Sequence, residues 1–100
     1  MNEADPTLLT AAQLASAPPD ERAGLVEAFL LASIGALTPP VPGPVTAASR
    51  LADLGIDSLQ LVELKFGLDQ VLGRELDIEL IIGNPTVGGL ARDGVRAAGL

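Results

Sequence analysis

Apolar residues recur along the chain at helical spacing, and nowhere do they alternate long enough to predict paired strands. The first long helix is predicted over residues 20–37, because Pro19 and the acids after it suit a helix start. We expect this helix to bury one apolar face. The members of that face are Leu25, Val26, Phe29, Leu30, Ala36 and Leu37, widened by Leu31 and Ile34.

The clearest helix is predicted over residues 58–72, followed by Gly73, the residue type that most often ends a helix in a left-handed turn. At about 100° per residue, its apolar residues fall into two stripes. The first has the width of a core face and consists of Leu61, Leu64, Leu68, Val71 and Leu72. The second lies on another side and consists of Leu59, Val62 and Phe66, bordered by Glu63, Asp69 and Gln70. A helix that packs on one face does not need this second stripe.

Shorter elements flank these two helices. Residues 7–16 predict a short helix that two prolines end, and residues 38–48 form a proline-rich loop in which no helix or central strand fits. Residues 78–82 predict one helical turn, since the chain offers them no partner strand. The last helix is capped by Thr86 and weakened by three glycines. Its inward residues are Val87, Leu90, Ala91 and Val95.

These elements predict an all-α fold, a small four-helix bundle whose third helix is short and whose first connection is long. A chain of 100 residues is long enough to bury one core but not two. We expect residues 1–18 to be an N-terminal linker or a short extra helix. Residues 19–98 then form the domain itself.

The composition removes most catalytic chemistry. The chain has no Cys and no His, which excludes disulfides, thiolate zinc sites and every histidine general base. Several acids lie in its second half, but they lack the regular spacing of a calcium loop, and we interpret them as solvated charges without a metal. These acids are Asp53, Asp69, Glu75, Asp77 and Glu79.

The charge balance limits the possible partners. A net charge of −7 repels nucleic acid and anionic membranes and attracts basic patches on partner proteins. Plain solubility explains the same charge equally well. No apolar run approaches the roughly 18–20 residues that span a membrane, and the acidic N-terminus lacks the basic start of a secretory signal. We therefore expect a cytoplasmic protein.

The stretch before the second long helix carries the candidate chemistry. Asp57 is placed to cap that helix, with Gln60 three residues on, as in a capping box. Gly55 allows a sharp turn just before the cap. Ser58 then sits in the first turn, where free N–H groups and the helix dipole favour attached negative charge. The position suits a phosphate ester.

The same stretch, Leu54-Gly55-Ile56-Asp57-Ser58-Leu59, resembles the attachment site of acyl carrier proteins. The likeness runs from about Leu51 to Ala91 and includes Val62-Glu63-Leu64-Lys65 and Asn84-Pro85-Thr86-Val87. The chain is most similar to the carrier domains of modular (type I) polyketide synthases. Peptidyl carriers usually have a second glycine where this chain has Ile56, so the likeness to them is weaker.

The resemblance implies a non-catalytic carrier with the same helical arrangement. Ser58 would hold covalent 4′-phosphopantetheine, transferred from coenzyme A by a phosphopantetheinyl transferase, and its thiol would carry acyl or polyketide intermediates as thioesters. Asp57 would lie beside the group and help partners recognise it. Leu59, Val62, Glu63 and Phe66 would form a docking surface for the transferase, ketosynthase, acyltransferase and other synthase domains. As an isolated domain it would be a monomer.

Other interpretations of these residues stay open. Ser58 can be an ordinary helix-start residue, and the second stripe can be a wider buried face or scattered surface residues. Glu63 can steer a charged partner or simply be solvated. The protein would then be a helical adaptor without a prosthetic group. A hydrolase that uses Ser58 is the third alternative, but the chain lacks a histidine to act as its base. Before the Asn84-Pro85-Thr86 segment, the family often has an aromatic residue and an acid. This chain has Ile82 and Gly83 at those positions, which weakens any partner contact assigned to that turn.

Overall fold

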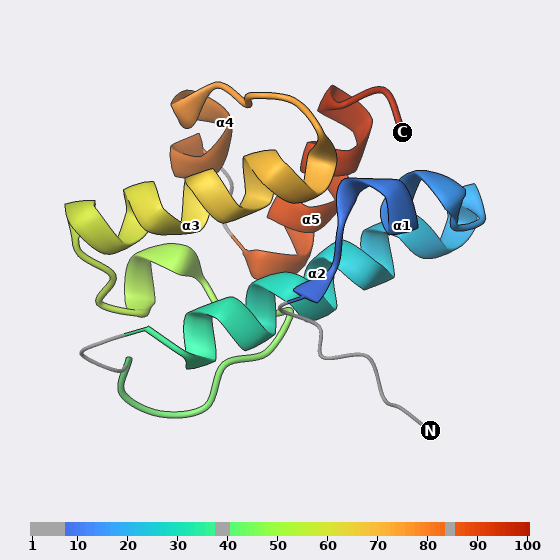
Figure 1. Cartoon of the computed structure of the whole chain (residues 1–100). Coiled ribbons are helices and arrows are strands. Elements are labelled where there is room, and N and C mark those ends of the chain that lie inside the picture. Colours follow the sequence, from blue (N-terminus) through green and yellow to red (C-terminus); the bar gives the residue numbers. More distant parts are fainter. Residues whose placement is uncertain (1–7, 38–40, 84–85) are drawn as a thin grey trace.

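A computed structural model describes residues 8–37, 41–83 and 86–100. Within these ranges the chain forms five α-helices and no strand, with a three-residue 3-10 turn in the connection between the two longest helices (Figure 1). The elements are α1 (Ala11–Ser16), α2 (Pro19–Gly35), the 3-10 turn Leu51–Asp53, α3 (Ser58–Leu72), α4 (Ile78–Gly83) and α5 (Val87–Ala97). The predicted all-α class is confirmed. In the described residues no helix is long and apolar enough to cross a membrane.

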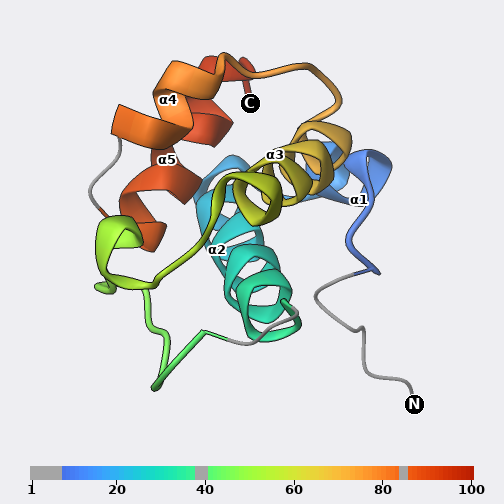
Figure 2. The same cartoon turned by 90° about the vertical axis from the view of Figure 1, so that its left-hand side faces the viewer.

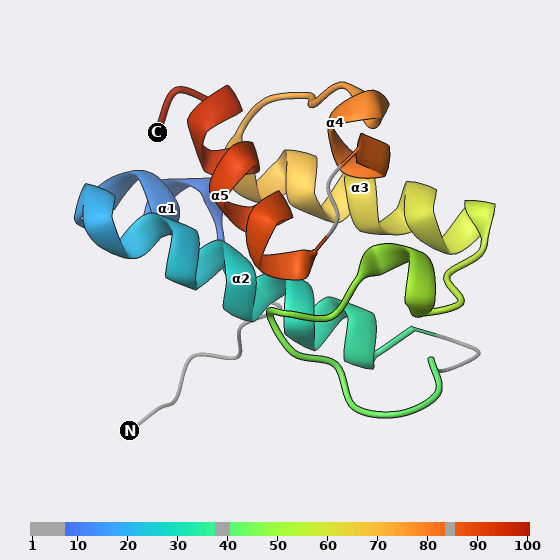
Figure 3. The same ribbon diagram turned by 180° about the vertical axis from the view of Figure 1, so that it is seen from behind.

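The helices pack around one core. Helix α5 makes its largest contact with α2 and also touches α4, and α3 packs on α2 and α1. Seen from the side on which α5 faces the viewer, α3 begins on the right, α4 lies above its middle, and α1 lies on the left (Figure 3). The start of α3 and helix α1 therefore lie at different ends of the molecule.

The core residues follow the predicted faces of α3 and α5. On α3, Leu64, Leu68, Val71 and Leu72 are buried and Leu61 is half-buried. The four residues predicted to face inward on α5 are all buried. These two predictions are confirmed, because regular helices of this length leave little freedom in which face meets the core.

The predicted face of α2 is partly wrong. Val26, Phe29, Leu30 and Ile34 are buried, but Leu25 is 37% exposed, since it lies about 100° around the helix from Val26. Ala36 is also exposed, because α2 ends at Gly35. The buried face is narrower than the sequence indicates.

Helix α1 is firmly held on the bundle. Thr10 and Gln13 cap it reciprocally, with the Gln13 N–H donating to Thr10 Oγ1 at 3.1 Å and the Thr10 N–H donating to Gln13 Oε1 at 3.0 Å. The Leu14 side chain is fully buried in the core. From α2, the Arg22 guanidinium donates to the carbonyls of Leu14 (3.2 Å) and Ala15 (2.8 Å), which lie near the end of this short helix. The Leu14 carbonyl also accepts the N–H of Ala17 at 3.1 Å.

The long loop before α3 is fastened to the first turn of α5. The N–H of Gly88 donates to the Ala47 carbonyl at 2.9 Å, and the N–H of Val87 donates to the Ser49 carbonyl at 3.2 Å. An antiparallel bridge pairs Arg50 with Thr86 beside them. The first residues of the predicted loop, 38–40, and Asn84-Pro85 of the motif named above lie outside the described residues.

A glycine makes this contact possible. A Cβ atom on Gly88 would meet the Ala47 carbonyl oxygen at 3.2 Å and its Cβ at 3.4 Å. From the sequence, Gly88 is expected only to weaken the helix. In the structure, its lack of a side chain allows α5 and the loop to approach closely.

The substitution Gly88→Ala should lower the free energy of unfolding by about 1 kcal/mol, because the added methyl group pushes the loop away from α5. Gly24→Ala in α2 is the matched control. Its new Cβ would meet nothing within 4 Å, so it should stabilise the protein by about 0.5–1 kcal/mol through helix propensity. Urea unfolding measures both. Equal effects of the two substitutions would contradict the close contact.

Candidate functional site

The start of α3 is fixed by a capping box, as the sequence predicts. The N–H of Gln60 donates to Asp57 Oδ1 at 2.7 Å, and the N–H of Asp57 donates to Gln60 Oε1 at 3.2 Å. Before the cap, Gly55 adopts a φ of 72°, which favours glycine. Leu54 is buried and anchors the turn to the core. The backbone that presents the next residue is therefore well determined.

Ser58 is the first residue of α3 and is exposed. Figure 2 looks at the end of the molecule where α3 begins, with the loop before it on the surface. The N–H groups in the first turn of a helix have no partner inside the helix. Of the N–H groups in this turn, the Asp57 side chain accepts only that of Gln60. An anion esterified to the Ser58 hydroxyl thus meets backbone donors and the positive end of the helix dipole.

The second stripe of α3 lies on the surface next to Ser58. Leu59 is 69% exposed, Val62 40% and Phe66 59%, and Glu63 between them is exposed as well. This outer stripe (Leu59, Val62 and Phe66) lies on the side of α3 away from the core face. The structure therefore brings the four predicted partner residues together on one exposed surface.

A pocket of about 430 Å³ lies beside the site, on the α4 side of α3. It is lined by Arg50, Leu51, Ala52, Ile56, Leu61, Ile81, Ile82 and Gly83. Two of these residues, Ile56 and Leu61, flank Ser58 in the sequence. Sequence reasoning missed the pocket, because nothing in the linear pattern places Arg50 close to α4.

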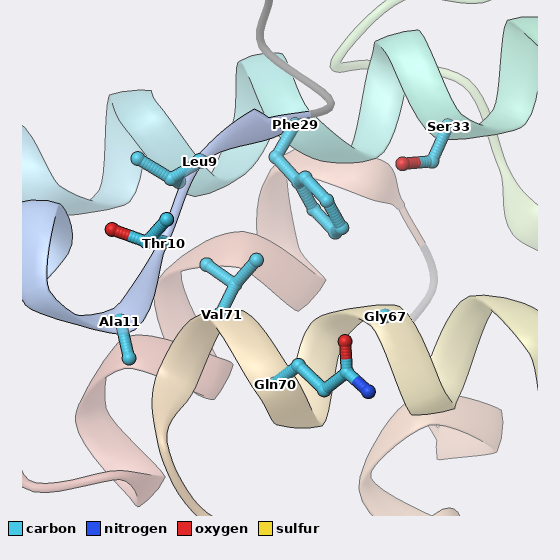
Figure 4. Close-up of a pocket in the computed structure, with 8 residues that line it drawn as sticks. All are labelled: Leu9, Thr10, Ala11, Phe29, Ser33, Gly67, Gln70 and Val71. Carbon is cyan, nitrogen blue, oxygen red and sulfur yellow. The ribbon is translucent and has the colours of Figure 1, made fainter.

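A second pocket, of about 500 Å³, lies between α1, α2 and α3 (Figure 4). Phe29 from α2 and Val71 from α3 point into it, and a Cβ on Gly67 would meet the Phe29 ring at 3.2 Å. Gly67 is about 13 Å along α3 from Ser58 by helical rise. The lining of this second pocket contains no ionisable side chain, so the candidate chemistry stays at the start of α3. The lining is Leu9, Thr10, Ala11, Phe29, Ser33, Gly67, Gln70 and Val71.

Asp69 is not the solvated charge that the sequence predicts. Its Oδ2 lies 2.6 Å from Lys65 Nζ, and its Oδ1 accepts the N–H of Leu76 at 2.9 Å. The hydrogen bond to Asp69 raises the pKa of Lys65 above its ordinary value of 10.5, so this lysine is charged at neutral pH. The Asp69–Leu76 hydrogen bond ties α3 to the connection before α4. The other acids in that group, Asp53, Glu75, Asp77 and Glu79, are exposed.

The site offers an anchoring hydroxyl. The sequence contains neither His nor Cys. Among the described residues, no three acids come close enough together to hold a metal ion. What the start of α3 does provide is an exposed alcohol on a capped helix, which fits a group joined through a phosphate ester.

Comparison with known families identifies that group. Residues 29–93 match the sequence profile described as the phosphopantetheine attachment site. The chain belongs to this family. Its prosthetic group is 4′-phosphopantetheine, derived from coenzyme A, and the family consists of non-catalytic carrier domains.

Two curated proteins are similar to parts of the carrier domain. A non-reducing polyketide synthase of Aspergillus fumigatus is 42% identical over 48 residues, which is 48% of this chain. A non-reducing polyketide synthase of Aspergillus terreus is 35% identical over 69 residues, or 69% of this chain. The matched stretch is only 3% of the length of either synthase.

The substitution Asp57→Ala should lower the free energy of unfolding by about 0.5–2 kcal/mol, because the Gln60 N–H loses its acceptor. Asp57→Asn is the control, since asparagine caps a helix about as well as aspartate. Thermal or urea unfolding measures both. If Asp57→Ala is as stable as the parent protein, the carboxylate does not hold the start of α3.

Proposed function

We propose that Ser58 is the residue that carries 4′-phosphopantetheine. The observation that supports this most directly is its exposed position at the capped start of α3, inside the matched family region. In the transfer, Ser58 Oγ forms a bond to the pantetheine-side phosphorus of coenzyme A. The P–O bond inside the diphosphate breaks, 3′,5′-adenosine diphosphate leaves, and the hydroxyl proton passes to a base of the transferase.

Within this function the protein supplies anchorage and recognition. The prosthetic group supplies the thiol that would hold an acyl or polyketide chain as a thioester. Asp57 fixes the backbone under Ser58, and the buried Leu54 keeps the preceding turn in place. Because Ser58 is exposed, the attached group extends from the surface, and the acyl chain on it can enter the active site of another domain.

The outer stripe is the proposed docking surface for those other domains. Three apolar side chains and Glu63 lie directly beyond Ser58, and such a small apolar patch edged by charge suits brief protein contacts. The net charge of −7 favours partners with a basic rim. The two similar synthases support the view that the partners are the transferase and the ketosynthase, acyltransferase and related domains of a polyketide synthase.

An adaptor without a prosthetic group is the second candidate. The outer stripe favours it, because a docking surface on α3 works whether or not Ser58 is modified. The two candidates differ in one measurable property, the covalent mass that the protein gains.

Incubation with coenzyme A and a phosphopantetheinyl transferase should add one phosphopantetheine group, seen by intact mass spectrometry. Ser58→Ala should gain nothing, because no other residue replaces the attachment oxygen. Ser16→Ala, which removes an exposed serine at the end of α1, should be modified like the parent protein. A parent protein that gains no mass would leave the adaptor as the better account.

The substitution Phe66→Ala should raise the KM of the transferase for this protein about five- to tenfold, the effect expected of a central aromatic in a docking surface. Its kcat should change little, since Phe66 lies two turns from Ser58. Leu25→Ala on α2 is the control, because it removes an apolar side chain that is also partly exposed. Equal KM values for both variants would mean that the stripe does not dock the transferase.

A further inference from the structure

Arg50 is a base at the edge of the pocket beside Ser58. It lines that pocket together with Ile56 and Leu61, which precede and follow Ser58 by a few residues. In the sequence it is the sole Lys or Arg between Arg22 and Lys65. The acids that follow it before the next base are Asp53, Asp57 and Glu63. Over residues 50–63, Arg50 is therefore the sole base among three acids.

The backbone of Arg50 is held in place. Its backbone forms the antiparallel bridge with Thr86, and its carbonyl accepts the N–H of Asp53 at 2.9 Å at the start of the 3-10 turn. The side chain thus starts from a fixed position in the wall of the pocket, although its end is exposed.

The Arg50 guanidinium is weakly engaged compared with Arg22 and Lys65. Its nearest acid is Asp53, with Nε to Oδ2 at 3.9 Å, which is beyond hydrogen-bond distance, and the two side chains are 66% and 72% exposed. By contrast, Arg22 donates to two carbonyls of α1, and Lys65 lies 2.6 Å from Asp69. The Arg50 guanidinium, in the wall of this pocket, therefore keeps donors available for a ligand.

We propose that the Arg50 guanidinium binds the phosphodiester of the phosphopantetheine attached to Ser58, an inference that rests on the attachment proposed above. Attachment adds a negative charge next to Asp57, and a cation close to the new phosphate offsets the resulting repulsion. A guanidinium presents two parallel N–H donors to phosphate oxygens, which an ammonium group cannot do. The contact holds the base of the arm on the α4 side of α3 and leaves the outer stripe open to partners.

The test compares the unmodified and the phosphopantetheine-bearing full chain by NMR. In the parent protein, the Arg50 Nε–H resonance should shift when the group is attached, and the shift should disappear in 1 M salt, where the screening length falls to about 3 Å. In Arg50→Gln the ³¹P resonance of the attached group should move away from its parent position. Arg50→Lys keeps the charge but lacks the two parallel N–H donors. Its ³¹P resonance should therefore lie between those of the parent protein and Arg50→Gln.

Arg96→Gln is the matched control. It removes the same charge from the last turn of α5, where Arg96 lies 3.6 Å from Asp93 and the two side chains are 81% and 42% exposed. Its ³¹P resonance should stay at the parent position. If the parent is fully modified and the Arg50 Nε–H does not shift, the contact is wrong and the carrier function stands. If mass spectrometry finds no modification at all, the attachment at Ser58 fails, and the contact with it.

Discussion

The hydrogen bonds between the first turn of α5 and the loop at residues 47–50 are the constraint on which the site depends. Prolines deprive this long loop of regular internal hydrogen bonds, so its position has to come from elsewhere. The α5 backbone supplies it, and Gly88 leaves the space needed. From this fixed point a few residues, including the 3-10 turn and the buried Leu54, lead directly to the Asp57 cap and Ser58.

Helix α3 serves two surfaces at once. Its inner face contributes four buried residues to the core, while its outer stripe leaves two large side chains more than half exposed. Because core packing fixes the rotation of the helix, it also fixes the direction in which the outer stripe and Ser58 point. The same burial that stabilises the bundle therefore determines what a visiting protein meets.

The sequence predicted the features that depend on short-range pattern. The Asp57–Gln60 capping box, the Gly73 helix end and the two stripes of α3 all follow from spacing within one helix. It failed where residues distant in the chain meet. The Lys65–Asp69 pair looks like surface charge until the turn after α3 brings the Leu76 N–H to Asp69. Likewise, nothing in the local pattern indicates that Gly88 packs on Ala47, or that Arg50 shares a pocket with α4.

The anchoring of α1 has a mechanical consequence. Leu14 is buried, and Arg22 joins the end of α1 to α2, close to where α3 finishes. Ser58 lies at the other end of α3, about 20 Å away by helical rise. A force on the chain just ahead of α1 would therefore reach the bundle at the end opposite Ser58. A rotation about the α1 end would move Ser58 through an arc whose radius is about this distance.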